Sequence, residues 1–381
     1  MNNKPAFDFD SRHVSAEWLT DEMRSRGYLE AGAISKIEQT PSALGTESPA
    51  EFFDVHVTYD AAAKGELPNQ MLLKVCLSGY HPQFDVIAQN LSAHYLRPHS
   101  AMANLIHKEA IFFDALRDKK IKQSSQIPAC YGTAISADGK ANCVLIEDLR
   151  HTHALPMFPL PPSLEACEAT VKTLAEIHAS WWDDEIFGEP EFEQVDIDLI
   201  REVQTSLTQA FKGFSDHLGD RLSPNRRRLY EKVLDNFEAL LARRFIETKS
   251  GFTLGHGDAH HWNFLLPQPN GVRQDTILFD WQSWHVDIGA HDLGFLMGVF
   301  WFRERRERFE EIMLRHYSEA LQKQGVEFDW DRLAQDYQLS LIRHLFTPIL
   351  LSSVTHPALW WAHLERIFAS FEDWDCAALL D

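Results

Sequence analysis

The chain of 381 residues has few cysteines, and their spacing argues against two common ways of stabilising a small fold. It contains 5 cysteines, an odd number, and no two of them form a Cys-x-x-Cys pair. Disulfide scaffolds use even sets of cysteines, and structural zinc sites use closely spaced pairs. The cysteines therefore predict reduced thiols, which are typical of the cytoplasm, and we expect a cytoplasmic protein.

Long apolar runs and positive charge are also scarce. No uninterrupted apolar run reaches the roughly 18 residues that a membrane-spanning helix needs, and the first residues show no apolar signal segment. The 36 basic residues are outnumbered by 56 acidic ones, giving a net charge of −20. Binders of nucleic acid or anionic lipid carry basic surfaces. We therefore expect neither a nucleic-acid partner nor a membrane span, and the sequence does not indicate an oligomeric state.

The first 150 residues show mainly β-type patterns. The apolar patterns predict strands at Ile34–Glu38, Glu51–Tyr59, Met71–Leu77, Pro128–Ala134 and Ala141–Leu149. Helical spacing predicts two helices in the same part, at Ser15–Arg26 and Ala101–Arg117, and the second carries Glu109 on its apolar face. A buried carboxylate is costly unless it is paired, so Glu109 requires a partner.

The pattern changes after residue 150. Helical spacing predicts helices at Ser163–Trp182, Asp196–Phe214 and Asn225–Glu247, with one short β interruption between Leu254 and Gln282 and further helices behind it. One of these, Arg303–Arg315, is expected to present a solvated charged face. We predict an α+β fold of two lobes, with residues 1–148 forming an antiparallel sheet and residues 149–381 mainly helical.

The β interruption opens with a dense group of polar residues, LGHGDAHHWNFLL. Asn263 follows Asp258 by five residues, and a short strand comes next. The turn signal Asn270-Gly271 then predicts a hairpin, whose returning strand ends at Asp280. The hairpin should bring Asp258, Asn263 and Asp280 together. Carboxylate and amide oxygens suit a hard divalent cation, although Asp and Asn also favour plain turns.

These motifs resemble a known superfamily. HGDAHHWNFLL, followed by ILFDWQSW and HDLGFLM, is similar to the aminoglycoside-phosphotransferase superfamily of small-molecule kinases. The stretches VLIEDL and FDWQ resemble most the ecdysteroid-kinase-like and choline-kinase-like branch. The resemblance extends from about Ile34 to about Met297, and it implies a bilobal protein-kinase-like fold.

The resemblance implies a role for each matching residue of the catalytic part. Asp258 corresponds to the catalytic base, and Asn263 and Asp280 correspond to the ligands of Mg²⁺. His256 resembles a scaffold residue of the catalytic loop, and Asp292 resembles a structural aspartate that braces it.

The resemblance also implies a nucleotide site. Lys74 corresponds to the lysine that holds the α and β phosphates of ATP, and Glu109 corresponds to its helical partner. Backbone groups near Glu147 and Leu149 would meet adenine. The nucleotide loop is unusual, since it has one glycine, Gly45, where the family is normally rich in glycine.

The expected activity is the transfer of a phosphoryl group from ATP, with Mg²⁺, to a hydroxyl of a small molecule. Two alternatives stay open. The glycine-poor loop favours a pseudokinase that binds a nucleotide or another ligand without turnover. A protein kinase is the other alternative, although no A-P-E-like segment or long activation loop follows Asp280. The sequence does not identify the acceptor.

Overall fold

The computed structural model describes residues 6–44, 50–77, 107–118, 125–189, 192, 195–269, 273–353 and 355–380. The chain forms two compact units. Unit 1 takes its described residues from Met1–Phe84, Asn104–Ala154 and Leu265–Gln282, and unit 2 takes its own from Leu155–Phe264 and Ser283–Asp381. The lobe boundary expected after residue 148 remains a prediction.

Unit 1 is built on an antiparallel sheet of five strands in the order β2-β3-β5-β7-β6. The strands are β2 (Ile34–Pro41), β3 (Ala50–Tyr59), β5 (Gln70–Leu77), β6 (Cys130–Ile135) and β7 (Ala141–Glu147). Side chains alternate between the two faces of a strand. On the central strand β5, Leu73 and Val75 therefore join one apolar core, and the side chain of Lys74 points to the other face.

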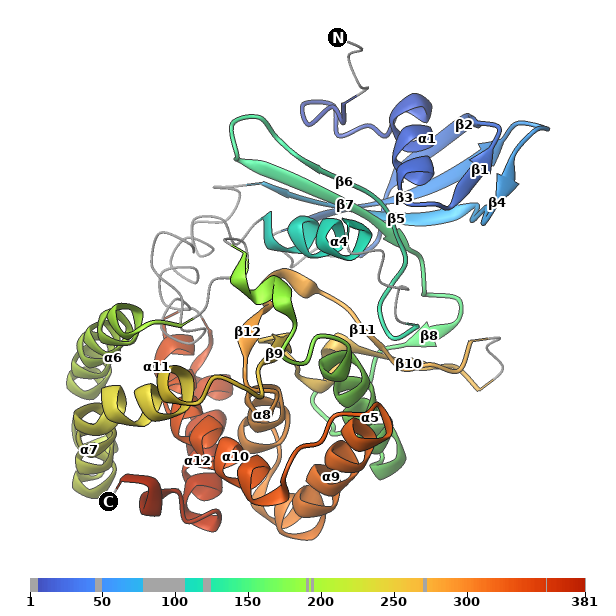
Figure 1. Ribbon diagram of the computed structural model, residues 1–381. Helices are drawn as coiled ribbons and strands as arrows, with labels where there is room; N and C mark the ends of the chain where they lie inside the picture. Colours follow the sequence, from blue (N-terminus) through green and yellow to red (C-terminus); the bar gives the residue numbers. More distant parts are fainter. Residues whose placement is uncertain are drawn as a thin grey trace. The chain divides into compact units, whose positions relative to one another are not determined.

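Two helices cover the two faces of this sheet (Figure 1). Helix α1 (Ala16–Ser25) begins at Ser15, whose side chain accepts a hydrogen bond from the Trp18 N–H, and it packs on the face of Leu73. Helix α4 (Lys108–Asp118) lies on the opposite face and carries Glu109 in its first turn. The two faces thus have different tasks, since one is an apolar core and the other receives charged groups.

Unit 1 also holds short strands that the sequence did not reveal. Strand β1 (Leu29–Ala31) pairs with β4 (Lys64–Gly65). Strand β10 (Phe264–Pro267) lies between β11 (Ile277–Leu278) and β8 (His153–Ala154) in a sheet of three strands. The segment between the two predicted lobes therefore contributes a strand, β8.

Unit 2 is mainly helical. Its helices are α5 (Leu164–Ser180), α6 (Ile197–Leu218), α7 (Pro224–Leu241), α8 (Ala290–Leu293), α9 (Arg303–Lys323), α10 (Trp330–His344), α11 (Thr347–Leu351) and α12 (Pro357–Asp373). Two π-helical turns, Ala242–Glu247 and Gly294–Val299, continue α7 and α8. The antiparallel pair β9 (Thr253–Gly255) and β12 (His285–Asp287) forms the only β element of this unit among the described residues. In the described part of the chain, no helix combines the length and the apolar character that a membrane crossing demands.

The expectation for Arg303–Arg315 is partly wrong. Several side chains of this stretch form the expected exposed i,i+4 pairs, such as Arg308 with Glu304. Arg306 and Glu310, however, are buried, at 1% and 4% exposure. Arg306 contacts Glu310 at 3.3 Å and Asp373 of α12 at 2.6 Å. The helical period places Arg306 and Glu310 on the buried face of α9. Their charges are tolerated there because each has a partner of opposite charge.

This difference predicts unequal effects of two similar substitutions on α9. Arg306→Ala leaves Glu310 and Asp373 without their buried cation, so we expect the free energy of unfolding to fall by about 3–5 kcal/mol. Arg308→Ala removes an exposed pair, and its cost should stay below about 1 kcal/mol. Urea denaturation followed by tryptophan fluorescence measures both, and equal effects of the two variants would contradict the buried network.

Candidate active site

Three of the candidate residues meet in unit 1. The Nζ atom of Lys74 lies 2.7 Å from Oε2 of Glu109 and 2.5 Å from Oδ1 of Asp280. Lys74 comes from the sheet, Glu109 from α4, and Asp280 from the end of the hairpin strand β11. The ammonium and Glu109 are buried, at 7% and 4% exposure. The structure therefore contains the Lys74–Glu109 ion pair that the sequence resemblance implies.

The two carboxyl groups act on the charge of Lys74. Burial alone would lower the pKa of Lys74, but Asp280 and Glu109 raise it well above its usual value, so the ammonium stays charged. Burial in turn raises the pKa of Glu109, against the lowering effect of Lys74. Such a set suits a further cation beside Asp280, the more exposed carboxylate.

The backbone after β11 holds this arrangement. Asp280 has a φ of 65°, a left-handed conformation that is uncommon for residues other than glycine and more frequent for Asp and Asn. The next residue, Trp281, donates its backbone N–H to Oε1 of Glu109 at 3.2 Å. Its ring stacks on Phe112 of α4, with 4.2 Å between the ring centroids. Strand end and helix are thus joined by charge, hydrogen bond and ring contact.

The other catalytic candidates lie in unit 2, in the loop from His256 to Asn263. Asn263 donates from Nδ2 to the backbone oxygen of Asp258 at 2.7 Å and to Oδ2 of Asp258 at 3.2 Å. Its amide nitrogen is thereby engaged with Asp258, and the chemistry of its Oδ1 atom suits a metal ligand. The side chain of Asp258 is 30% exposed, so a substrate hydroxyl could reach it.

Gly257 explains the sequence of this loop. Its φ is 81°, and an added Cβ atom would lie 2.5 Å from the backbone oxygen of Ser283. A side chain here would have to displace the neighbouring backbone. The glycine therefore stands at this position because of the conformation and packing of the loop.

Asp292 of α8 braces the loop through its backbone. Its two carboxylate oxygens accept the N–H groups of His256 at 2.7 Å and Gly257 at 2.8 Å. His178 of α5 lies 3.2 Å from the same carboxylate, and its other ring nitrogen lies 2.8 Å from the hydroxyl of Tyr317. Burial would raise the pKa of Asp292, but the hydrogen bond and charge of His178 keep it below the usual value.

His178 is fully buried. The sequence did not reveal its contact with Asp292, because α5 and α8 are more than 100 residues apart in the chain. The double histidine of the loop also has a structural part, since His261 accepts a hydrogen bond from Trp301 at 2.7 Å. Burial lowers the pKa of His261 to about 3, so this ring is neutral.

The remaining nucleotide candidates, Glu147 and Leu149, have other partners than the Lys74 group. The backbone N–H of Glu147 donates to Ala129, and its side chain contacts Arg273 at 2.6 Å. Leu149 is buried, and its carbonyl accepts hydrogen bonds from Thr152 and His153. Gly45 lies outside the described residues, as does the predicted Asn270-Gly271 turn.

Comparison with known families decides the affiliation of the chain. The sequence profile of the ecdysteroid kinase-like family matches residues 108–327, which is more than half of the 381 residues. The chain belongs to the ecdysteroid kinase-like family. The match includes α4 with Glu109 and the whole of the loop around Asp258, whereas Lys74 precedes it. A search of curated proteins finds no match.

Solved structures similar to this ecdysteroid kinase-like protein include a candidate aminoglycoside phosphotransferase from Ralstonia eutropha JMP134. It matches with a TM-score of 0.51 and 12% identity, over 94% of this chain and 97% of that chain. A choline kinase from Streptococcus pneumoniae matches with a TM-score of 0.48 and 12% identity, over 89% of this chain and 94% of that chain. The first match confirms the predicted α+β, protein-kinase-like fold class.

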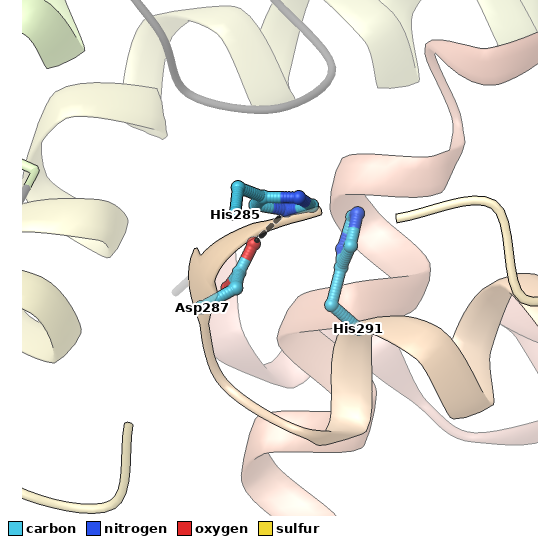
Figure 2. A group of neighbouring side chains, drawn as sticks. All are labelled: His285, Asp287 and His291. Atoms are coloured by element: carbon cyan, nitrogen blue, oxygen red, sulfur yellow. Dashed lines mark hydrogen bonds and ion pairs between the residues drawn. The ribbon is translucent and has the colours of Figure 1, made fainter. Parts of the chain in front are cut away.

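A second buried group lies close to the loop around Asp258 of this ecdysteroid kinase-like protein. His285 and Asp287 project from β12 toward each other, and His291 of α8 stands beside them (Figure 2). Their ligand atoms lie within 4.8 Å of one another, close enough to hold a metal ion. Arg343 of α10, however, contacts both oxygens of Asp287, at 2.8 and 2.7 Å.

The partners of Asp287 identify this group as an ion-pair network. Its Oδ2 atom also contacts His285 at 2.9 Å, and its Oδ1 atom accepts the Ile288 N–H at 2.7 Å. A divalent cation would have to displace these partners and would be repelled by Arg343. The sequence missed this network, although a charged residue in the apolar run LSLIRHLF was a visible signal.

The network predicts a pH-dependent loss of stability. Burial would raise the pKa of Asp287, but Arg343 and His285 hold it far below the usual value. A carboxylate with a lowered pKa in the folded state stabilises the fold above its unfolded pKa of about 3.9, and this contribution is lost as the pH falls further. Between pH 5 and about pH 2, the wild type should therefore lose stability more steeply than Asp287→Asn.

At pH 7, Asp287→Asn should lower the free energy of unfolding by about 3–5 kcal/mol, because Arg343 stays buried without its carboxylate. Asp198→Asn, on an 89% exposed side chain, is the matched control and should unfold like the wild type. Thermal unfolding with EDTA or with added Zn²⁺ checks the alternative. A rise in the unfolding temperature with Zn²⁺ that disappears in Asp287→Asn would contradict the ion-pair network.

Proposed function

We propose that this protein transfers the γ-phosphoryl group of ATP, with Mg²⁺, to a hydroxyl group of a small molecule in the cytoplasm. The observation that carries the proposal is the buried Lys74 ammonium between Glu109 and Asp280. A buried lysine shared by two carboxyl groups is expensive as a purely structural device. It fits a site that receives phosphates and a divalent cation.

Each residue has a distinct part in this proposal. Asp258 takes up the proton of the substrate hydroxyl, and the oxygen of this hydroxyl attacks the γ phosphorus of ATP. The bond between the γ phosphorus and the oxygen that leaves with ADP breaks. Lys74, oriented by Glu109, binds the α and β phosphates. Asn263 and Asp280 would hold Mg²⁺, which when bound neutralises phosphate charge.

The remaining family residues are proposed to support these steps. His256 and Asp292 fix the backbone that presents Asp258, which reduces the cost of orienting the base. Backbone groups around Glu147 and Leu149 would bind adenine, and Gly45 would approach the phosphates. The contacts of Asp292 with the loop support this assignment.

A nucleotide-binding protein without turnover is the second candidate. The glycine-poor loop around Gly45 favours it, because fewer backbone N–H groups can approach the phosphates closely. The two functions share Mg·ATP binding and differ in turnover, so separate variants at Asp280 and Asp258 distinguish them.

Asp280→Ala should abolish metal-dependent nucleotide binding. In the wild type, Mg·ATP at about 100 times its Kd should stabilise the fold by roughly 2.7 kcal/mol, which a thermal-shift titration detects. The variant should show no such shift, and Asp275→Ala, a nearby exposed carboxylate of unit 1, should behave like the wild type. The absence of a shift in the wild type would reject the nucleotide site.

Asp258→Ala should retain Mg·ATP binding and lose turnover. Removing a general base typically lowers kcat by about 10²–10⁴-fold. The assay follows ADP formation with the best acceptor from a panel of amino alcohols, sugars and sterols. The exposed Asp216 of α6 provides the control variant Asp216→Ala. A near-wild-type kcat for Asp258→Ala would remove Asp258 from the mechanism, and tight Mg·ATP binding without turnover by the wild type would favour the pseudokinase.

A further inference from the structure

A single arginine joins the two faces of the five-stranded sheet in unit 1. Arg26 follows α1 directly, and its side chain contacts β6 and α4. Helix α4 lies on the face of the sheet opposite α1 (Figure 1). Its side chain is only 4% exposed, although it lies at a helix end, where arginines usually point into solvent. A guanidinium carries five N–H donors in a fixed plane, and most of them have a partner here.

The partners of Arg26 come from three elements. Its Nη2 atom donates to Oδ1 of Asp114 on α4 at 2.7 Å and to Oγ1 of Thr133 on β6 at 2.6 Å. Its Nη1 atom donates to the backbone oxygen of Phe113 at 3.3 Å, and its Nε atom donates to Glu22 of α1 at 3.3 Å. Thr133 also donates to Asp114 at 2.6 Å, which closes a ring of hydrogen bonds.

These contacts fix α4 close to the residue that matters for the proposed site. Asp114 and Phe113 lie five and four residues after Glu109 on the same helix. At about 1.5 Å per residue, the two contact points are separated by little more than one helical turn. A helix segment of this length moves as a rigid body, so a shift at Asp114 is passed to the carboxylate of Glu109.

Apolar packing and hydrogen bonds together hold this part of α4. Phe112, Phe113 and Leu116 are buried, and a pocket of about 480 Å³ beside Arg26, which is partly open to solvent, has Phe113 and Leu116 in its wall. Apolar contacts are not directional, so the hydrogen bonds of Arg26 add a directional constraint at Asp114.

We propose that Arg26 is a positioning residue for nucleotide binding, acting through α4 on the Lys74–Glu109 pair. The proposal rests on the proposed function, since it assigns Arg26 a part in the same site. Arg26 contacts neither Lys74 nor Glu109 in the structure, and its effect is to hold the helix at the position where Glu109 meets the ammonium of Lys74.

The test compares Arg26→Met with Arg24→Met. Arg24 lies on the last turn of α1, is 49% exposed, and donates to the Gly32 carbonyl, so its loss should change the Kd for Mg·ATP less than twofold. Arg26→Met should raise this Kd at least tenfold at a temperature where both variants are folded. Arg26→Lys keeps the charge without the planar set of donors, and it should restore part of the affinity.

A double-mutant cycle separates positioning from general stabilisation. If Arg26 acts through Glu109, Arg26→Met combined with Glu109→Gln should bind Mg·ATP no more than twofold weaker than Glu109→Gln alone, because coupled residues do not add. Effects that multiply would overturn the proposal. A Kd within twofold of the wild type for Arg26→Met would also overturn it, even if the variant unfolds at a lower temperature.

Hydrogen exchange of the amides in α4 provides a readout that does not depend on ATP. The exchange should become at least tenfold faster in Arg26→Met and stay unchanged in Arg24→Met. If Arg26→Met does not fold, Asp114→Asn replaces it, because Asp114 is 34% exposed and its loss weakens the same contacts. Failure of the wild type to bind Mg·ATP would reject the proposed function. The exchange of the α4 amides would then decide whether Arg26 holds the helix, and unchanged exchange in Arg26→Met would overturn that role.

Discussion

The buried ammonium of Lys74 is the constraint on which unit 1 depends. A lysine on the central strand of a sheet cannot reach water at 7% exposure, so its charge must be balanced locally. One carboxylate comes from α4 and the other from the end of β11, 206 residues later in the chain. The sheet, the helix and the hairpin therefore meet at one point, and none of the three can shift without exposing an unbalanced charge. The left-handed backbone at Asp280 and the stacking of Trp281 on Phe112 follow from this requirement.

Unit 2 holds its loop in a different way. Asp258 is presented by a backbone whose N–H groups end on Asp292, and Asp292 is itself held by His178. These contacts are mostly hydrogen bonds to a single buried carboxylate, and they fix the geometry of the backbone around Asp258. Strand β12, which pairs with the strand before this loop, carries Asp287, whose ion pair with Arg343 is buried. The loop is thus held by buried groups of its own unit.

A feature could be predicted from the sequence when it depends on residues that are close together in the chain. Helix α1, the strands around Lys74 and the loop of Asp258 depend on local spacing and turn residues, and the sequence predicted them. The pairs of Arg306 with Asp373 and of Arg343 with Asp287 join residues 67 and 56 positions apart. From the local sequence pattern alone, such charges are predicted to lie on a solvated face. Their buried partners are distant in the chain and are brought close only when the helices pack. Strand β8 was missed for the same reason, since two residues pair with a segment more than 100 positions away.

The different construction of the two sets of residues has a consequence for function. The set around Lys74 is coupled to the position of α4, so under the proposed function a change there acts first on the binding of phosphate and cation. The set around Asp258 is a loop whose backbone is held by hydrogen bonds, with one partly exposed carboxylate, so under the proposed function a change there acts first on proton transfer. Arg26 belongs to the former set, because α4 connects it with Glu109. The two sets therefore differ in what holds them: ion pairs around Lys74, and backbone hydrogen bonds around Asp258.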